Sequence, residues 1–174
     1  IDKIYTKNSH NEKYEEKIED TPEGKQWKAV AEKSLTNAVS VKLPYKIQGH
    51  FPAGKPRALS FEFDARHGEQ ITFNMEKNLS MLILYADVFK KENDETKHLY
   101  SANVDSSHFS FDAEENGSYI VRLQPQLNSA GTYSFSITTG PSIGFPVSDK
   151  KARVGSFWGD ARDDGARRHE GIDI

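Results

Sequence analysis

One histidine and one aspartate near the end of the sequence have the side chains and spacing to bind a metal ion. His169 stands four residues before Asp173, within the segment Arg168–Ile174. A neutral imidazole nitrogen and a carboxylate oxygen are both good zinc ligands. A catalytic zinc takes three protein ligands and keeps one position for the water that it acidifies, so the pair supplies two of the three ligands that hydrolysis requires.

The spacing of this pair is not diagnostic by itself. From six His and twelve Asp, about 0.4 pairs at this spacing arise by chance. A second pair, His108 and Asp112, has the same spacing inside an alternating run that predicts an ordinary strand. The residues around His169 therefore have to carry the assignment.

Those surrounding residues resemble the first metal motif of a known enzyme family. The run Gly155–Arg162, the glycine-containing loop after it and Arg168–Ile174 are similar to that motif in the lysostaphin/LytM-type zinc metallopeptidases, which cleave peptide cross-links of bacterial cell walls. The resemblance covers only the C-terminal tail and its approach at Phe145–Val147. It implies that His169 and Asp173 bind zinc.

The same resemblance implies further residues downstream. In this family a strand-borne His-x-His supplies the third ligand and a catalytic histidine, and the 174 residues contain no His-x-His. The final Gly171–Ile174 reads as the opening of a strand. We therefore expect the N-terminal portion of a peptidoglycan-cleaving zinc metallopeptidase, without catalytic residues or hydrolytic activity of its own. An extracytoplasmic location, periplasmic or cell-envelope, follows from the resemblance alone.

Composition argues against several other functions. The net charge is −3, whereas a protein that neutralises nucleic-acid phosphates has a basic surface. Without cysteine the chain has no disulfide, thiolate metal site or cysteine nucleophile. No apolar run approaches the roughly 18 residues of a membrane-spanning helix.

Other titratable residues are expected to be structural. His50, His67 and His98 are scattered, which predicts positions on the surface or at the rim of a domain. Glu62 and Asp64 lie on the polar side of a predicted strand and are expected to be solvated.

The hydrophobic pattern predicts one helix followed by strands. Residues 1–20 are polar and charge-rich, and fit both a mobile leader and a short amphipathic helix. Thr21–Pro22 predicts an N-cap followed by proline at the first helical position, and apolar residues continue at helical spacing to Ala38. From residue 39 the period changes to two, which predicts strands.

About eight short strands are predicted up to residue 139. The apolar run Met81–Phe89 predicts a strand covered on both faces, Lys90–Lys97 a charged turn, and Gln124–Pro125 a break. Many short strands at regular intervals are typical of an antiparallel β-sandwich, with a jelly roll as the first topology. The fold class is therefore mainly β.

Two of the predicted strands carry a second resemblance. Gly117–Leu123 and Gly131–Ile137 look like the closing strands of bacterial pre-peptidase β-sandwich domains.

The expected organisation has four parts. They are a polar leader at 1–20, a helix plus β-sandwich accessory domain at 21–139, a Pro- and Gly-containing linker at 140–153, and the truncated start of a β-rich, peptidase-like domain at 154–174. The accessory domain would position substrate or shield the cleft. Alternatively, the sandwich is itself a non-catalytic binding module for glycan, cell-wall peptide or a protein partner.

Overall fold

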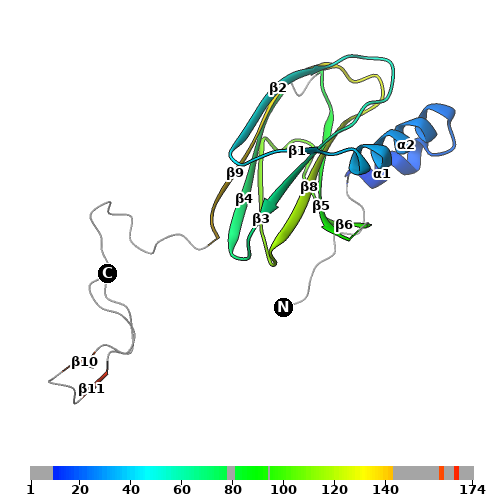
Figure 1. The fold of residues 1–174 in the computed structure, drawn as a ribbon. Coiled ribbons are helices and arrows are strands. Elements are labelled where there is room, and N and C mark those ends of the chain that lie inside the picture. The colour runs from blue at the N-terminus through cyan, green and yellow to red at the C-terminus, as the bar shows by residue number, and fades with distance from the viewer. Residues whose placement is uncertain (1–9, 78–80, 94, 143–160, 163–166, 169–174) are drawn as a thin grey trace. The chain divides into compact units, whose positions relative to one another are not determined.

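The computed structural model in Figure 1 describes residues 10–77, 81–93, 95–142, 161–162 and 167–168. The chain divides into two units, Ile1–Ser142 and Ile143–Ile174. In the second unit, β10 (Ala161–Arg162) and β11 (Arg167–Arg168) form a short antiparallel pair.

The described part of the first unit consists of two helices and nine strands. The helices are α1 (His10–Ile18) and α2 (Pro22–Thr36). The strands are β1 (Val39–Ser40), β2 (Tyr45–Phe51), β3 (Leu59–Ala65), β4 (Glu69–Lys77), β5 (Leu84–Glu92), β6 (Glu95–Ser101), β7 (His108–Asp112), β8 (Gly117–Pro125) and β9 (Gly131–Pro141). They form sheet A, in the order β1–β3–β8–β5–β6, and sheet B, in the order β2–β9–β4–β7.

The strand pairing confirms the predicted sandwich and its jelly-roll topology. β2 pairs with β9, β3 with β8, β4 with β7 and β5 with β6, all antiparallel, so the chain forms one long ribbon of nested pairs. Rolling this ribbon places β9 beside β4 and β8 beside β5, which completes two sheets. One short pairing differs from the expected pattern, because β1 runs parallel to β3 over two residues.

Alternation along the strands builds the core between the sheets. In β4, Ile71, Phe73 and Met75 are fully buried, while Thr72 and Asn74 face away from the core. The inward side chains of both sheets join into one cluster that runs from Phe51 to Ile137 in sequence.

The two helices cover the outer face of sheet A, and Figure 1 shows them beside β1, β8 and β5. α2 begins as predicted, since Thr21 is its N-cap and Pro22 its first residue, and Thr21 Oγ1 accepts a hydrogen bond from Gly24 N at 3.0 Å. Residues His10–Ile18, for which a leader and a helix both fitted the sequence, form α1.

Aromatic side chains anchor the helices to the sheet. Trp27 of α2 is 1% exposed, and its Nε1 donates to the carbonyl oxygen of Pro125 at 2.8 Å. Tyr14 of α1 stacks on Tyr85 of β5, with ring centroids 5.7 Å apart. Because helices lie on one side and the core on the other, Leu84–Phe89 is buried on both faces, as predicted. The predicted strand began at Met81, but β5 starts at Leu84, and Met81 and Ile83 are exposed.

Two local predictions are wrong. Lys90–Lys97 is not a charged turn, because β5 continues to Glu92, β6 starts at Glu95, and the chain reverses near Asn93, which has φ 56°. Gln124–Pro125 is not a break, because β8 continues through it. In the described part of the chain, no helix is long and apolar enough to cross a membrane.

Candidate functional site

The predicted metal pair, His169 and Asp173, lies outside the described residues. β11 ends at Arg168, the residue before His169. The zinc-ligand role of both residues stays a prediction. Within the parts of the chain that the structure describes, no three His, Asp or Glu side chains come together as a metal site.

The pair with the same spacing, His108 and Asp112, is part of a strand as expected. Both are exposed and both belong to β7. Four strand residues span about 13 Å, so the two side chains are too far apart to share one ion. His108 Nδ1 instead lies 3.0 Å from the side-chain oxygen of Asn74 on the neighbouring strand.

The remaining histidines and the two strand carboxylates occupy mostly expected positions. His50, His67 and His98 are exposed, as predicted. Asp64 is exposed, but Glu62 is half-buried and accepts hydrogen bonds from Lys91 and Ser118, so the prediction of a solvated carboxylate is wrong for Glu62. Burial raises the pKa of Glu62, but the Ser118 hydroxyl and the Lys91 ammonium outweigh it and lower the pKa below its usual value.

A buried carboxylate, Asp87 on β5, organises a cluster of polar side chains on the outer face of sheet A. Asp87 is 2% exposed. Its carboxylate accepts hydrogen bonds from Asn11 Nδ2 at 2.6 Å, Ser101 Oγ at 2.6 Å and Arg122 Nη2 at 2.9 Å. Burial alone raises the pKa of Asp87, but the His98 imidazole, the Arg122 guanidinium and the Ser101 hydroxyl together hold it below its usual value. Asp87 and these four side chains are the Asp87 cluster.

Ser101, His98 and Asp87 are the residue types of a hydrolytic triad, but their hydrogen bonds are in the wrong order. In a triad the histidine accepts the serine proton and the aspartate holds the other ring nitrogen. Here Ser101 donates its proton to Asp87, so His98 Nε2, 2.9 Å from Ser101 Oγ, has to be the donor in that contact. His98 is therefore not placed to accept the Ser101 proton as a triad histidine does. The cluster instead joins α1 to the sheet through the contact of Asn11 with Asp87.

The outer face of sheet B is polar across all four strands. Its rows are set by the pairing register: Gln48, Ser134 and Glu76; Lys46, Ser136, Asn74 and His108; Thr138, Thr72 and Ser110; and Gly140, Gln70 and Asp112. Every one of these residues is exposed or half-buried. We call this surface the sheet B face.

The centre of the sheet B face is rich in hydroxyl groups. Along β9 the outward residues are Thr132, Ser134, Ser136 and Thr138, which we call the hydroxyl ladder. Sequence reasoning missed the ladder, although alternate residues from 132 to 138 already showed Ser or Thr between buried apolar residues.

One end of the sheet B face is hollowed. The hollow is open to solvent and has a volume of about 610 Å³; its lining residues are Gln48, Gly49, Glu76, Lys77, Thr132, Tyr133 and Ser134. At its border Lys77 Nζ donates to the carbonyl oxygens of Leu84 at 3.1 Å and Val104 at 2.8 Å, which fixes the end of β4. Burial lowers the pKa of Lys77 to about 8, against an opposing effect of Asp105.

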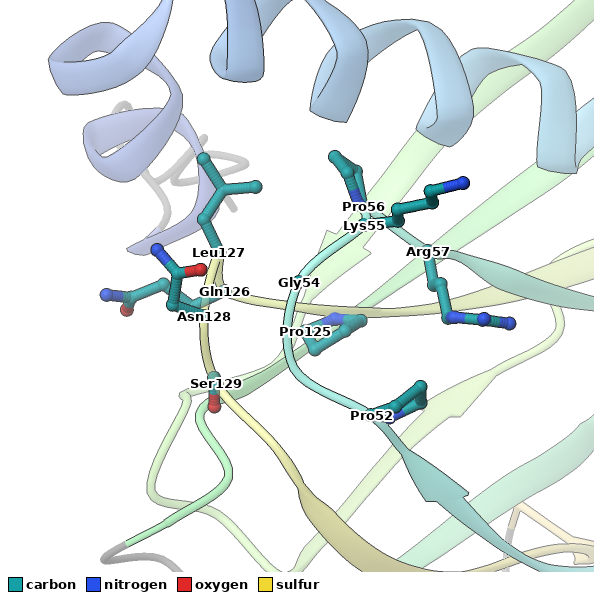
Figure 2. A pocket seen from close by; sticks show the side chains of 10 residues that line it. All are labelled: Pro52, Gly54, Lys55, Pro56, Arg57, Pro125, Gln126, Leu127, Asn128 and Ser129. Carbon is teal, nitrogen blue, oxygen red and sulfur yellow. The ribbon is translucent and has the colours of Figure 1, made fainter.

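A second hollow lies between the β2–β3 and β8–β9 connections (Figure 2). Its cavity volume is only about 10 Å³, far below the roughly 300–1,000 Å³ of common ligand pockets. In Figure 2 the side chains of Lys55 and Arg57 extend away from the Gln126–Ser129 segment. These cations therefore do not converge with the polar groups on the other side, and we assign no ligand to this hollow.

Neither a protein-family model nor a curated protein matches this chain. Among solved structures, the pre-peptidase C-terminal domain of a collagenase from Bacillus anthracis is 18% identical with a TM-score of 0.49, over 58% of this chain and 94% of that chain. PliG of Aeromonas hydrophila, a periplasmic inhibitor of g-type lysozyme, is 10% identical with a TM-score of 0.46, over 59% and 97%. CorA, a surface-associated copper-binding protein of Methylomicrobium album BG8, is 10% identical with a TM-score of 0.42, over 59% and 98%.

These likenesses concern the fold alone. The fold and the geometry of residues 10–142 are consistent with a β-sandwich accessory or binding module.

Proposed function

We propose that this chain is the N-terminal portion of an extracytoplasmic zinc metallopeptidase that cleaves the cross-link peptides of peptidoglycan. In this proposal the β-sandwich is an accessory domain that positions the substrate. The observation that supports it is that the sandwich and the metal-motif residues occupy separate parts of the chain. The buried residues of the hydrophobic core lie between Phe51 and Ile137, whereas the metal-motif residues belong to a separate unit after Ser142.

His169 and Asp173 would supply two zinc ligands. Their imidazole and carboxylate donors fit zinc, and the third ligand would come from a His-x-His beyond Ile174. When bound, zinc acidifies a water molecule and polarises the peptide carbonyl. The two residues of this chain hold and orient the ion and leave the proton transfers to the downstream histidine.

The test compares this 174-residue chain with an extended chain that includes the following hundred or so residues, a domain-sized stretch. We expect the extended chain to retain zinc and clear suspensions of purified cell walls, and His169→Ala or Asp173→Ala to abolish both. The 174-residue chain should bind zinc weakly and hydrolyse nothing. Binding orders the segment that holds the two ligands, and two metal bonds do not offset the conformational entropy that is lost. Metal content is measured by plasma emission and hydrolysis by turbidity.

His108→Ala is the matched control, since His108 has an aspartate at the same spacing on an exposed strand. It should change neither zinc content nor clearing. Stoichiometric zinc and wall clearing by the 174-residue chain, or metal retained after His169→Ala in the extended chain, would show that the tail is not a peptidase metal motif.

The second candidate function is a non-catalytic binding module. The sheet B face supports it, because its exposed polar groups belong to a rigid sheet. Absence of a His-x-His from the following hundred or so residues would favour this candidate over the peptidase.

A further inference from the structure

We infer that the sheet B face binds the glycan strand of peptidoglycan, along the hydroxyl ladder and into the hollow at Gln48, Glu76 and Ser134. This inference rests on the proposed function, since it gives the accessory domain its substrate-positioning surface. It assigns the glycan to the sandwich and leaves the cross-link peptide to the peptidase domain.

The two faces of the sandwich are not equivalent. α1 and α2 pack on the outer face of sheet A, and several polar residues beneath them form hydrogen bonds with the helices, as in the contacts of Ser60 with Ser34 and of Gln124 with the carbonyl oxygen of Trp27. On the sheet B face, the side chains of Gln48, Ser134 and Glu76 keep their hydrogen-bonding groups for solvent or a ligand. The sheet B face is thus the candidate for recognition.

The inner strands of this face differ from an ordinary solvated surface. Charged residues make up 28% of the chain, yet the outward positions of β9 and β4 include a single charged residue, Glu76. Ser and Thr have short side chains with few rotamers, so fixing them against a ligand costs less entropy than fixing Lys or Glu. The hydroxyl ladder is therefore a preorganised row of donors and acceptors.

The chemistry of the face selects a neutral ligand rich in hydroxyl and amide groups. An anionic ligand needs converging cations. The strands of the face present one lysine, Lys46, at an edge, and Lys77 at the border of the hollow already donates its ammonium group to two backbone carbonyl oxygens. A mainly apolar ligand needs aromatic or aliphatic contact area, and none of the outward residues in the four rows provides it. Sugar hydroxyl and acetamido groups match serine, threonine and side-chain amides as donors and acceptors.

The shape of the face favours a glycan over an extended peptide. A peptide in strand form gains most of its affinity by pairing with a free strand edge, which uses backbone groups rather than outward side chains. The hydroxyl ladder lies on β9, an inner strand whose backbone is already paired with β2 and β4. Four strands span about 14 Å, a width that suits a short oligosaccharide lying across the rows.

The experiment measures binding of the 174-residue chain to two probes by titration calorimetry. One probe is soluble N-acetylglucosamine oligosaccharides, which carry the hydroxyl and acetamido groups of the glycan strand without the lactyl carboxylates that removal of the peptides exposes. The other probe is the free stem peptides. Ser134→Arg places a long cation in the hollow and Thr138→Arg one at the far end of the ladder. We expect each to weaken glycan binding at least tenfold.

Thr96→Arg is the matched control, because Thr96 is an exposed threonine on β6 of sheet A. It should leave glycan binding unchanged. Amide resonances of β9 and β4 should shift on addition of glycan, while those of β6 should not. Circular dichroism and thermal unfolding of each variant separate blocked binding from failure to fold.

Three results would overturn the inference: no glycan binding, glycan binding undiminished by both arginine variants, or binding of stem peptides alone. The result is independent of the zinc test. If the glycan binds and the extended chain lacks zinc and activity, the proposed peptidase fails and the assignment of the face stands. If the extended chain is active and the glycan does not bind, the proposed peptidase stands and the assignment of the face fails.

Discussion

At the scale of single residues, the most constrained group in the described chain is the Asp87 carboxylate. It is ionised in a site that water hardly reaches, and its charge is compensated by Arg122 and by hydrogen bonds from Asn11 and Ser101. Some polar atoms near Asp87 lack a hydrogen-bond partner, since Asn11 Oδ1, Arg122 Nε and Gln124 Oε1 are buried without a protein partner. Bridging water molecules are the usual solution for such atoms.

Asp87→Asn should destabilise the protein by about 3–5 kcal/mol, because it leaves the guanidinium of Arg122 buried without its counter-charge. The measurement is urea unfolding followed by circular dichroism at neutral pH. The matched control is Asp64→Asn on β3 of the same sheet, where the carboxylate is exposed and the change should stay within about 0.5 kcal/mol. Equal stabilities of the two variants would contradict a stabilising role for the cluster.

The same variants test how the stability of the protein depends on pH in the acid range. The pKa of Asp87 is lowered in the folded state, so the stability that it contributes is present above the unfolded pKa of about 4 and is lost as pH falls through the folded pKa. The wild-type chain should therefore lose more stability in acid than Asp87→Asn does.

At the scale of elements, the turn between α1 and α2 depends on the absence of a side chain at Gly24. A Cβ atom there would lie 1.8 Å from the carbonyl oxygen of Ile18, a backbone atom that cannot move without moving α1. Thr21 caps α2 in the same turn. The two helices can meet this closely only because residue 24 is glycine.

Gly24→Ala should therefore lower the melting temperature, although alanine favours a helix over glycine by about 1 kcal/mol in an exposed helix interior. Trp27 reports the displacement, and its emission in a Trp158→Phe background should shift to longer wavelength. Gln26→Ala, at an exposed position of the same helix, is the control and should cause neither change. Unchanged emission and melting temperature in Gly24→Ala would refute the close contact.

Sequence periodicity predicted most elements because one face of each strand meets a single apolar core. Alternation predicted β2, β3, β4, β7, β8 and β9, and the continuous apolar run predicted β5. The prediction failed where the outer face of a strand packs against a helix, as at Gln124, which is polar and fully buried because it faces α2 rather than the core. Alternation also disappears where both faces are charged, as in the hairpin around Asn93.

At the scale of the whole molecule, the candidate site could be predicted only in part. The types of residue in the hydroxyl ladder are visible in the sequence, but their assembly into rows needs the order of sheet B, which joins residues about ninety positions apart, such as Gln48 and Ser134. That order follows from the nesting of four strand pairs and not from any local pattern. The zinc-ligand pair His169 and Asp173 could be proposed without the fold, because its residues are close together in sequence, and its role stays a prediction.

The nested pairing also determines how the sandwich responds to mechanical load. β2 begins at Tyr45 opposite Ile137 of β9, and their pairing ends at Phe51 opposite Gly131, so the polypeptide enters and leaves this strand pair at the same end. Tension between the two flanking segments then breaks the backbone hydrogen bonds between β2 and β9 one after another, starting at that end, instead of loading all of them at once. Because the barrier to unfolding governs resistance to force, we expect optical tweezers to unfold this sandwich at a lower force than a domain whose terminal strands are sheared.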